Sequence, residues 1–229
     1  MRQIVLDTET TGLDWRTGDR VIEIGCIVLD GRQRSKYHFH SYLNPQRPVD
    51  PGAMAVHGLT DEFLADKPKF ADVVVAWSDF VRGAELIIHN AAFDVGFLNN
   101  ELQLLDLPPI EKLCGNVVDT LKMARDLRPG RKNNLNALCV EFAVDNSNRE
   151  LHGALLDAEL LADVYLAMTR GQNSLLIDFG GTTGSVEGID PNRAPLRVLR
   201  ASDEELAAHE AVLLDLSKES KGKCLWSAS

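Results

Sequence analysis

The order of apolar and polar positions along the chain predicts a group of strands first and an alternation of strands and helices afterwards. Short apolar runs at residues 3–7, 21–29 and 36–43 are separated by polar turns, which is typical of neighbouring strands in a meander. Two further short apolar runs predict strands at 85–88 and around 117–118. This order of elements favours a mixed sheet covered by helices.

Segments with helical periodicity fill the spaces between these strands. The spacing of apolar residues predicts a short helix through 53–56, a helix over 70–82 that stops at Gly83, and a helix from 91 to about 105. After Pro108 and Pro109 interrupt the chain, the same spacing predicts further helices at 120–127, 135–142 and 155–169. The pattern of a globular domain ends at Gly171.

Beyond Gly171 the composition changes. Residues 180–185 are rich in glycine, serine and threonine, as is typical of a flexible linker. Ser202 and Glu205 have the spacing of a capping box, and the helix that follows carries several leucines on roughly one side. Such a helix has no core of its own, so it folds against a partner or docks back on its own domain. We therefore expect a domain at 1–171, a flexible linker at 172–195 and a binding tail at 196–229.

The composition narrows the possible classes of protein. The 229 residues carry a formal net charge of −10, whereas independent DNA-binding domains usually have a basic face. The charge argues against a sequence-specific binding module and fits an enzyme that meets nucleic acid through metal ions at one strand end. No apolar run is long enough for a membrane helix, and no secretory leader pattern opens the chain. Four scattered cysteines without metal-binding spacing favour a cytoplasmic protein with free thiols.

Two acids stand at the end of the first predicted strand. Asp7 and Glu9 are two positions apart and therefore point to the same face. Carboxylates at such close range raise each other's pKa unless a cation lies between them, and hard oxygen ligands favour Mg²⁺ or Mn²⁺. A pair of solvated acids at a strand end is the alternative, and this motif alone does not decide between the two.

Two later segments place further acids near predicted helix starts. Asn90 is expected to cap the helix that begins at residue 91, so Asp94 lies one turn inside that helix and on the same side. His152 precedes the last helix of the domain, and Asp157 follows inside it. Taken separately, an acid in a first turn also complements the helix dipole, and a lone histidine before a helix is more often structural.

Together these residues form three motifs in a fixed order. Asp-x-Glu, Asn-x₃-Asp and His-x₄-Asp resemble the DEDD superfamily of 3′→5′ exonucleases, in its histidine subtype. Segments spread over the whole chain further resemble the epsilon (proofreading) subunits of bacterial DNA polymerase III; they are 7–12, 56–58, 83–94, 151–157 and 224–226. The resemblance implies a ribonuclease-H-like α/β fold, with a mixed sheet flanked by helices and a flexible C-terminal tail.

The resemblance also implies a role for each residue of the motifs. Two divalent ions, Mg²⁺ or Mn²⁺, are held by four carboxylates, with a histidine as general base for phosphodiester hydrolysis: Asp7, Glu9, Asp94, Asp157 and His152. The terminal nucleotide of a single-stranded 3′ end is bound by a second set: Thr10, Leu13, Val56, His57, Asn90 and Phe93. For Phe93, a place in the hydrophobic core is the alternative. The implied activity is the removal of misincorporated nucleotides by a polymerase subunit.

Partners follow from the same resemblance. The tail after Gly171 is expected to bind the alpha subunit of DNA polymerase III. Residues 172–177 resemble a sliding-clamp-binding peptide that lacks an aromatic residue, so this contact is expected to be weak. The resemblance also allows a small theta-type subunit as a partner, although no residue of the sequence identifies it. No membrane partner is expected.

Two other interpretations remain open at this point. A stand-alone RNA exonuclease of the same superfamily would use identical chemistry, but it would have little need of the linker and the tail helix. A non-catalytic adaptor with this fold would have no use for four clustered carboxylates. The linker and the intact motifs therefore favour the proofreading exonuclease.

Overall fold

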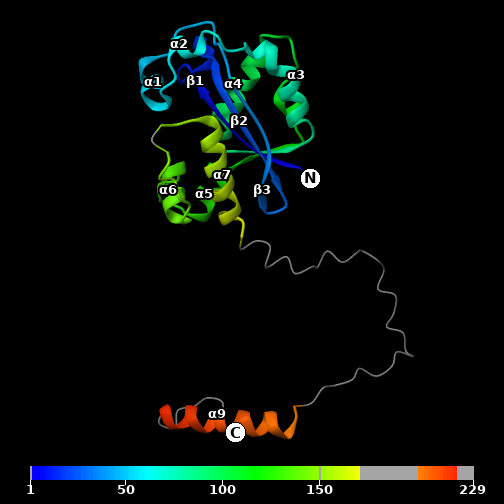
Figure 1. The fold of residues 1–229 in the computed structure, drawn as a ribbon, viewed down its shortest axis with the longest axis vertical. Helices are drawn as coiled ribbons and strands as arrows, with labels where there is room; N and C mark the ends of the chain where they lie inside the picture. The colour runs from blue at the N-terminus through cyan, green and yellow to red at the C-terminus, as the bar shows by residue number, and fades with distance from the viewer. Residues whose placement is uncertain (1, 150, 171–200, 221–229) are drawn as a thin grey trace, which may run out of the picture. The chain divides into compact units, whose positions relative to one another are not determined.

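The computed structural model of the chain describes residues 2–149, 151–170 and 201–220. The chain divides into two units, Met1–Ile177 and Asp178–Ser229, each of which is described by itself. The first unit contains a sheet with helices packed on it, and the second contributes one described helix (Figure 1). Within the described ranges, every helix is too short or too polar to cross a bilayer.

The sheet has the strand order β3-β2-β1-β4-β5, so the first strand of the chain lies at its centre. β1 (Gln3–Thr10), β2 (Val21–Asp30) and β3 (Gln33–Tyr42) form the predicted antiparallel meander. β4 (Glu85–Ile88) and β5 (Asn116–Asp119) extend the sheet beyond β1 as parallel strands. The predicted mixed sheet is confirmed, and β1 is hydrogen-bonded to a neighbour along each edge.

The helices lie close to their predicted positions. They are α1 (Pro51–His57), α2 (Asp61–Leu64), α3 (Phe70–Val81), α4 (Ala91–Gln103), α5 (Thr120–Leu127), α6 (Leu135–Glu141), α7 (Ala154–Met168) and α9 (Asp203–Glu219). The sequence analysis missed α2 and two short 3₁₀ helices, Trp15–Thr17 and Ile110–Lys112. Elements of three or four residues are too short to show a helical period in the sequence.

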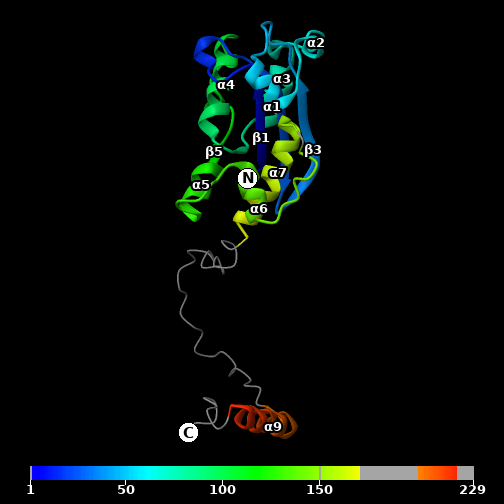
Figure 2. The ribbon, with the colours of Figure 1, turned by 90° about the vertical axis from the view of Figure 1, so that its left-hand side faces the viewer.

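Different helices cover the two faces of the sheet, because successive strand residues point in opposite directions. Ile4 and Leu6 of β1 pack in one cluster with residues of α3 and α4. Val5 packs on the opposite face, in a cluster with residues of α7, and α4 and α7 lie on different sides of β1 in Figure 2. Asp7 and Glu9 alternate in step with Val5 and therefore belong to the face that α7 covers.

A glycine lets α7 begin directly against the sheet. A Cβ atom at Gly25 would lie 2.3 Å from the backbone of Ala154, the first residue of α7. Gly25 is also the cross-strand partner of Asp7 in the pairing of β1 with β2. The missing side chain therefore brings the first turn of α7, which contains Asp157, next to the strand that carries Asp7.

The described helix of the second unit begins with the predicted capping box. The Ser202 hydroxyl accepts a hydrogen bond from the Glu205 backbone N–H at 3.3 Å, and the Glu205 carboxylate accepts one from the Ser202 N–H at 2.8 Å. The predicted linker at 172–195 and the clamp-type peptide at 172–177 lie outside the described residues. The three-part division of the chain stays a prediction.

Candidate active site

The two strand acids occupy the positions that the alternation of β1 predicts. Asp7 is partly buried, and Glu9 is only 8% exposed although it carries an ionisable group. Both follow the apolar part of the central strand, which is hydrogen-bonded on both sides and so fixes the two backbone positions. The site is therefore built on the central strand of the sheet.

The third motif brings His152 and Asp157 to the same place. Asp157 is buried in the first turn of α7, while His152 lies in the preceding segment with its side chain 43% exposed. The backbone N–H of His152 donates to the carbonyl of Val56 in α1 at 3.1 Å, which ties this segment to the opposite wall of the site. Ligand atoms of Glu9, His152 and Asp157 all lie within 4.8 Å of one another.

Asp94 reaches the site from the other helical layer. It lies in the first turn of α4 and is buried, and its Oδ1 accepts hydrogen bonds from the Thr8 backbone N–H at 3.1 Å and the Thr8 hydroxyl at 2.7 Å. Asn90 does occupy the N-cap position of α4. The predicted side-chain cap is wrong, however, because Asn90 has a left-handed backbone (φ 64°) and makes no cap hydrogen bond.

The electrostatics of this cluster favour bound cations. Burial is the main cause that raises the pKa of Asp7 well above its usual range, raises the pKa of Glu9 to about 8 and raises that of Asp94 to about 7. Repulsion by neighbouring carboxylates adds to the shift of Asp7 and Glu9, whereas the Thr8 hydrogen bonds partly oppose that of Asp94. Burial and the nearby Arg149 lower the pKa of His152. An all-oxygen set of mutually repelling acids with one imidazole beside it fits hard divalent ions.

Sequence reasoning missed two charged residues of this site. The Arg149 guanidinium donates to Asp157 through Nε and Nη2, each at 2.5 Å, and Nη2 also donates to His152 Nδ1 at 2.9 Å. Glu23 is buried opposite Glu9 in the strand pairing and contacts His40 at 2.7 Å. The position of Glu23, an acid inside the apolar run of β2, was a signal in the sequence. No motif pointed to Arg149.

A cavity of about 550 Å³ opens beside the carboxylates. Most of the residues expected to bind the terminal nucleotide line it: Thr10, Leu13, Val56, His57 and Phe93. His57 is buried, its Nδ1 accepts from the Leu59 N–H at 3.0 Å, and its Nε2 has no hydrogen-bond partner among the described residues. Phe93 both lines the cavity and packs on Phe97 at a centroid distance of 4.8 Å, so its two interpretations are compatible.

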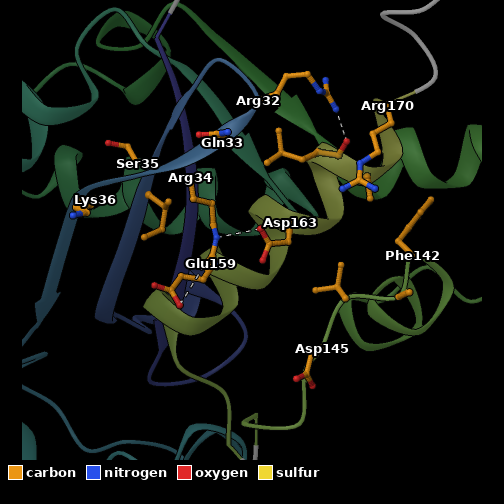
Figure 3. Close-up of a pocket in the computed structure, with 15 residues that line it drawn as sticks. Arg32, Gln33, Arg34, Ser35, Lys36, Phe142, Asp145, Glu159, Asp163 and Arg170 are labelled. Atoms are coloured by element: carbon orange, nitrogen blue, oxygen red, sulfur yellow. Dashed lines mark hydrogen bonds and ion pairs between the residues drawn. The ribbon is translucent and has the colours of Figure 1, made fainter.

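Two other hollows lie away from the carboxylates. Asn90 does not line the cavity of the other expected substrate residues but a neighbouring groove with Arg125 and Arg131. A larger groove of about 960 Å³ runs between β3, α7 and the segment after α6 (Figure 3). There Arg34 contacts Glu159 at 3.6 Å and Asp163 at 3.1 Å on the exposed side of α7. This groove lacks the combination of buried acids and imidazole.

Comparisons with known proteins agree with this geometry. The family model described as Exonuclease (RNase_T) matches residues 4–165. The DNA polymerase III subunit epsilon of Escherichia coli (strain K12) is 50% identical over 239 aligned residues, covering 99% of this chain and 98% of the relative. The corresponding subunit of Pasteurella multocida (strain Pm70) is 48% identical, covering 98% and 93%. A solved structure of Exonuclease X with 5′ overhanging duplex DNA superposes with a TM-score of 0.60 at 27% identity, covering 75% of this chain and 93% of that one.

The fold and the sequence relatives lead to the same assignment. The mixed five-strand sheet is the ribonuclease-H-like arrangement expected from the motifs, and it carries those motifs on the strand and the two helices that meet at one end of β1. The matched segment covers all of the sheet except its first residue, Gln3, and most of α7. The chain therefore belongs to the exonuclease family and, within that family, to the epsilon subunits of DNA polymerase III, and its activity is that of a proofreading 3′→5′ exonuclease.

Proposed function

We propose that the chain hydrolyses the terminal phosphodiester of a DNA 3′ end at the cluster of Asp7, Glu9, Asp94 and Asp157, with His152 as general base. The observation that carries this proposal is the convergence of buried carboxylates and a partly exposed imidazole beside a cavity of about 550 Å³. The alternative of solvated acids at a strand end is disfavoured by their burial. The adaptor interpretation offers no reason to keep such a costly cluster.

Two divalent ions fit the donor set, with Mg²⁺ and Mn²⁺ as the candidates. Asp7, Glu9, Asp94 and Asp157 would hold these ions between them. When bound, such ions neutralise charge on the phosphate oxygens and orient the attacking water and the leaving group. The carboxylates contribute by holding this charge at the end of β1, where Thr8 fixes Asp94 through two hydrogen bonds.

His152 is suited to accept the proton of the attacking water. Its lowered pKa keeps the imidazole neutral at neutral pH, and a general base must be unprotonated to act. Its side chain is half-exposed, so water can reach it, and it lies within 4.8 Å of ligand atoms of Glu9 and Asp157. In the described structure Nδ1 accepts from Arg149, so the proton-accepting nitrogen is available only if that contact changes or if Nε2 is the base.

The cavity supports a sequence-tolerant grip on the terminal nucleotide. Phe93 and His57 offer flat surfaces on which any base can stack, and Leu13 stands at the rim with 85% of its surface exposed. The buried Nε2 of His57 is available for a substrate oxygen. Mismatch selectivity then needs no reading of the wrong base, because a frayed end costs less free energy to unpair and unstack.

The second unit supports a role in assembly. A lone helix cannot bury its own apolar side, and α9 carries Leu206, Val212, Leu213 and Leu216. We expect this tail to bind the polymerase alpha subunit, which would raise the local concentration of the exonuclease at the primer end. The weak clamp contact through residues 172–177 and a theta-type partner remain part of the proposal. Cys26, Cys114 and Cys139 are free thiols, in keeping with the proposed cytoplasmic location.

A nuclease assay on the purified chain tests the proposal. It compares a mismatched primer–template, a matched one, single-stranded DNA and a short RNA in the presence of Mg²⁺, with Asp7→Ala as the inactive control. Shortening of mismatched and single-stranded DNA from the 3′ end is the expected result. A preference for RNA would instead assign the same residues to an RNA-processing enzyme.

A further inference from the structure

One cation is already built into the carboxylate cluster, and it comes from the chain itself. Arg149 binds both carboxylate oxygens of Asp157, and the two side chains are only 5% and 4% exposed. The same guanidinium donates through Nη2 to Nδ1 of His152. Its positive charge also acts on Asp7 and Glu9, whose pKa values it lowers against the effect of burial. A single group therefore contacts an expected metal ligand and the expected base.

The guanidinium and a directly coordinated metal ion compete for the same atoms. A bidentate arginine uses the oxygen lone pairs in the plane of the carboxylate, which are also the positions from which Asp157 would bind an ion. A second positive charge at this distance also repels the incoming ion, and burial strengthens that repulsion. Full occupancy of both Asp157 oxygens by Arg149 is therefore incompatible with the proposed metal set.

The surroundings of Arg149 allow this contact to be exchanged. Its third nitrogen, Nη1, donates at 2.7 Å to Oδ1 of Asn136 in α6, which lies outside the carboxylate cluster. The described residues between α6 and α7 form no helix or strand, and the Arg149 backbone N–H makes only a turn hydrogen bond, to the Asn146 carbonyl at 3.0 Å. The guanidinium can leave Asp157 while keeping its anchor on Asn136.

We propose that Arg149 is an exchangeable counter-cation of the active site, which holds Asp157 and His152 together until a divalent ion displaces it. In this role Arg149 is a positioning residue, since it acts through Asp157 and His152. In the metal-free chain its positive charge compensates the negative charge of the buried carboxylates. When an ion binds Asp157 and displaces the guanidinium, Nδ1 of His152 loses its hydrogen bond to Arg149 and can accept a proton. This inference rests on the proposed metal site.

Mn²⁺ titration of the full chain by calorimetry measures the competition directly. Arg149→Gln should bind Mn²⁺ about tenfold more tightly than the wild type, because the competing charged hydrogen bonds are gone. Arg34→Gln is the control, since Arg34 also pairs with acids of α7, in this case two acids on the exposed side (Figure 3), and it should leave the affinity unchanged. In EDTA, Arg149→Gln should have a lower melting temperature than the wild type. Saturating Mn²⁺ should reduce this difference in melting temperature.

Each outcome has a separate meaning. Equal or weaker Mn²⁺ binding by Arg149→Gln would overturn the inference and leave Arg149 as a fixed support of Asp157. A wild-type chain that binds no Mn²⁺ would instead remove the proposed metal site itself. If Arg149→Gln does not fold, the Arg149 Nε–H signal of the wild-type chain is followed by NMR during Mg²⁺ titration. The signal should move toward the position of a free guanidinium, and an unchanged signal at saturation would overturn the inference.

Discussion

Helix α7 supplies the acids of two arginine–carboxylate clusters that differ in burial. In the first cluster Arg149 holds Asp157 at 2.5 Å, and the two side chains are 5% and 4% exposed. In the second, across a small hollow that both arginines line, Arg34 contacts Glu159 and Asp163, and these three side chains are 39% to 42% exposed. The first cluster faces β1 and the active site, whereas the second lines the groove of Figure 3.

The difference teaches that burial, rather than the presence of paired charges, identifies the functional side of the helix. An exposed ion pair is screened by water and contributes about 0–1 kcal/mol. Removing one partner of a buried pair leaves an uncompensated charge and costs about 3–5 kcal/mol. The chain can maintain such a cluster only where it serves a purpose, and here it adjoins the strand acids and the cavity. Four matched pairs of substitutions test this contrast.

The largest effect is expected from matched changes of two acids of α7. Asp157→Asn should abolish exonuclease activity, and the loss should exceed the roughly 10²–10⁴-fold that removal of a general base costs, because ion binding itself fails. Asp163→Asn changes the same residue type on the exposed side of the same helix and should keep wild-type activity. Initial rates on single-stranded DNA with Mg²⁺ measure both. Comparable losses in the two variants would mean that burial does not separate the clusters.

A second contrast concerns two histidines. His152→Ala should lose roughly 10²–10⁴-fold in rate while it still binds Mn²⁺, since a base is removed and the carboxylate ligands remain. His38→Ala is the control, because His38 is exposed and its side chain hydrogen-bonds only to the Lys36 carbonyl among the described residues. Rates and Mn²⁺ calorimetry on the same samples separate the two roles. Failure of His152→Ala to bind Mn²⁺ would make His152 a ligand instead of a base.

The third contrast compares the two arginines through stability. Arg149→Gln should lower the free energy of unfolding of the metal-free chain by about 3–5 kcal/mol, whereas Arg34→Gln should lower it by at most about 1 kcal/mol. Urea denaturation in EDTA measures both values. If the two variants lose similar stability, the Arg149 pair is no more consequential than an ordinary surface pair.

The sequence was sufficient for the sheet and for the acids that share motifs. The alternation of β1 placed Asp7 and Glu9 on one face, and helical periodicity put Asp94 and Asp157 in first turns, as the structure bears out. These features depend only on local geometry with a short period. The spacing within α7 did not reveal which of its acids is buried, because that depends on how the helix packs on β2 at Gly25.

What the sequence could not predict depends on tertiary contacts without a local pattern. Arg149 belongs to a segment with no regular element, so its position opposite Asp157 follows from the path of that segment alone. Asn90 has the residue type of a helix cap, yet its backbone takes the left-handed conformation and its side chain caps nothing. Local propensity was overridden at a position beside the candidate site, where strain of this kind is common.

A further expected effect, on stability alone, is a pH dependence of the metal-free chain. Glu9 has a pKa of about 8 in the folded chain against an ordinary value of 4.5, so between these values the unfolded chain releases its proton first. The free energy of unfolding therefore falls as pH rises from about 5 to about 8. Glu9→Gln cannot release this proton and should show a shallower decline in EDTA, whereas Glu159→Gln on the exposed side should decline like the wild type. Mn²⁺ should suppress the decline in the wild type, because the ion replaces the proton on Glu9. Equal slopes for Glu9→Gln and the wild type in EDTA would show that burial of Glu9 does not contribute to the pH dependence of stability.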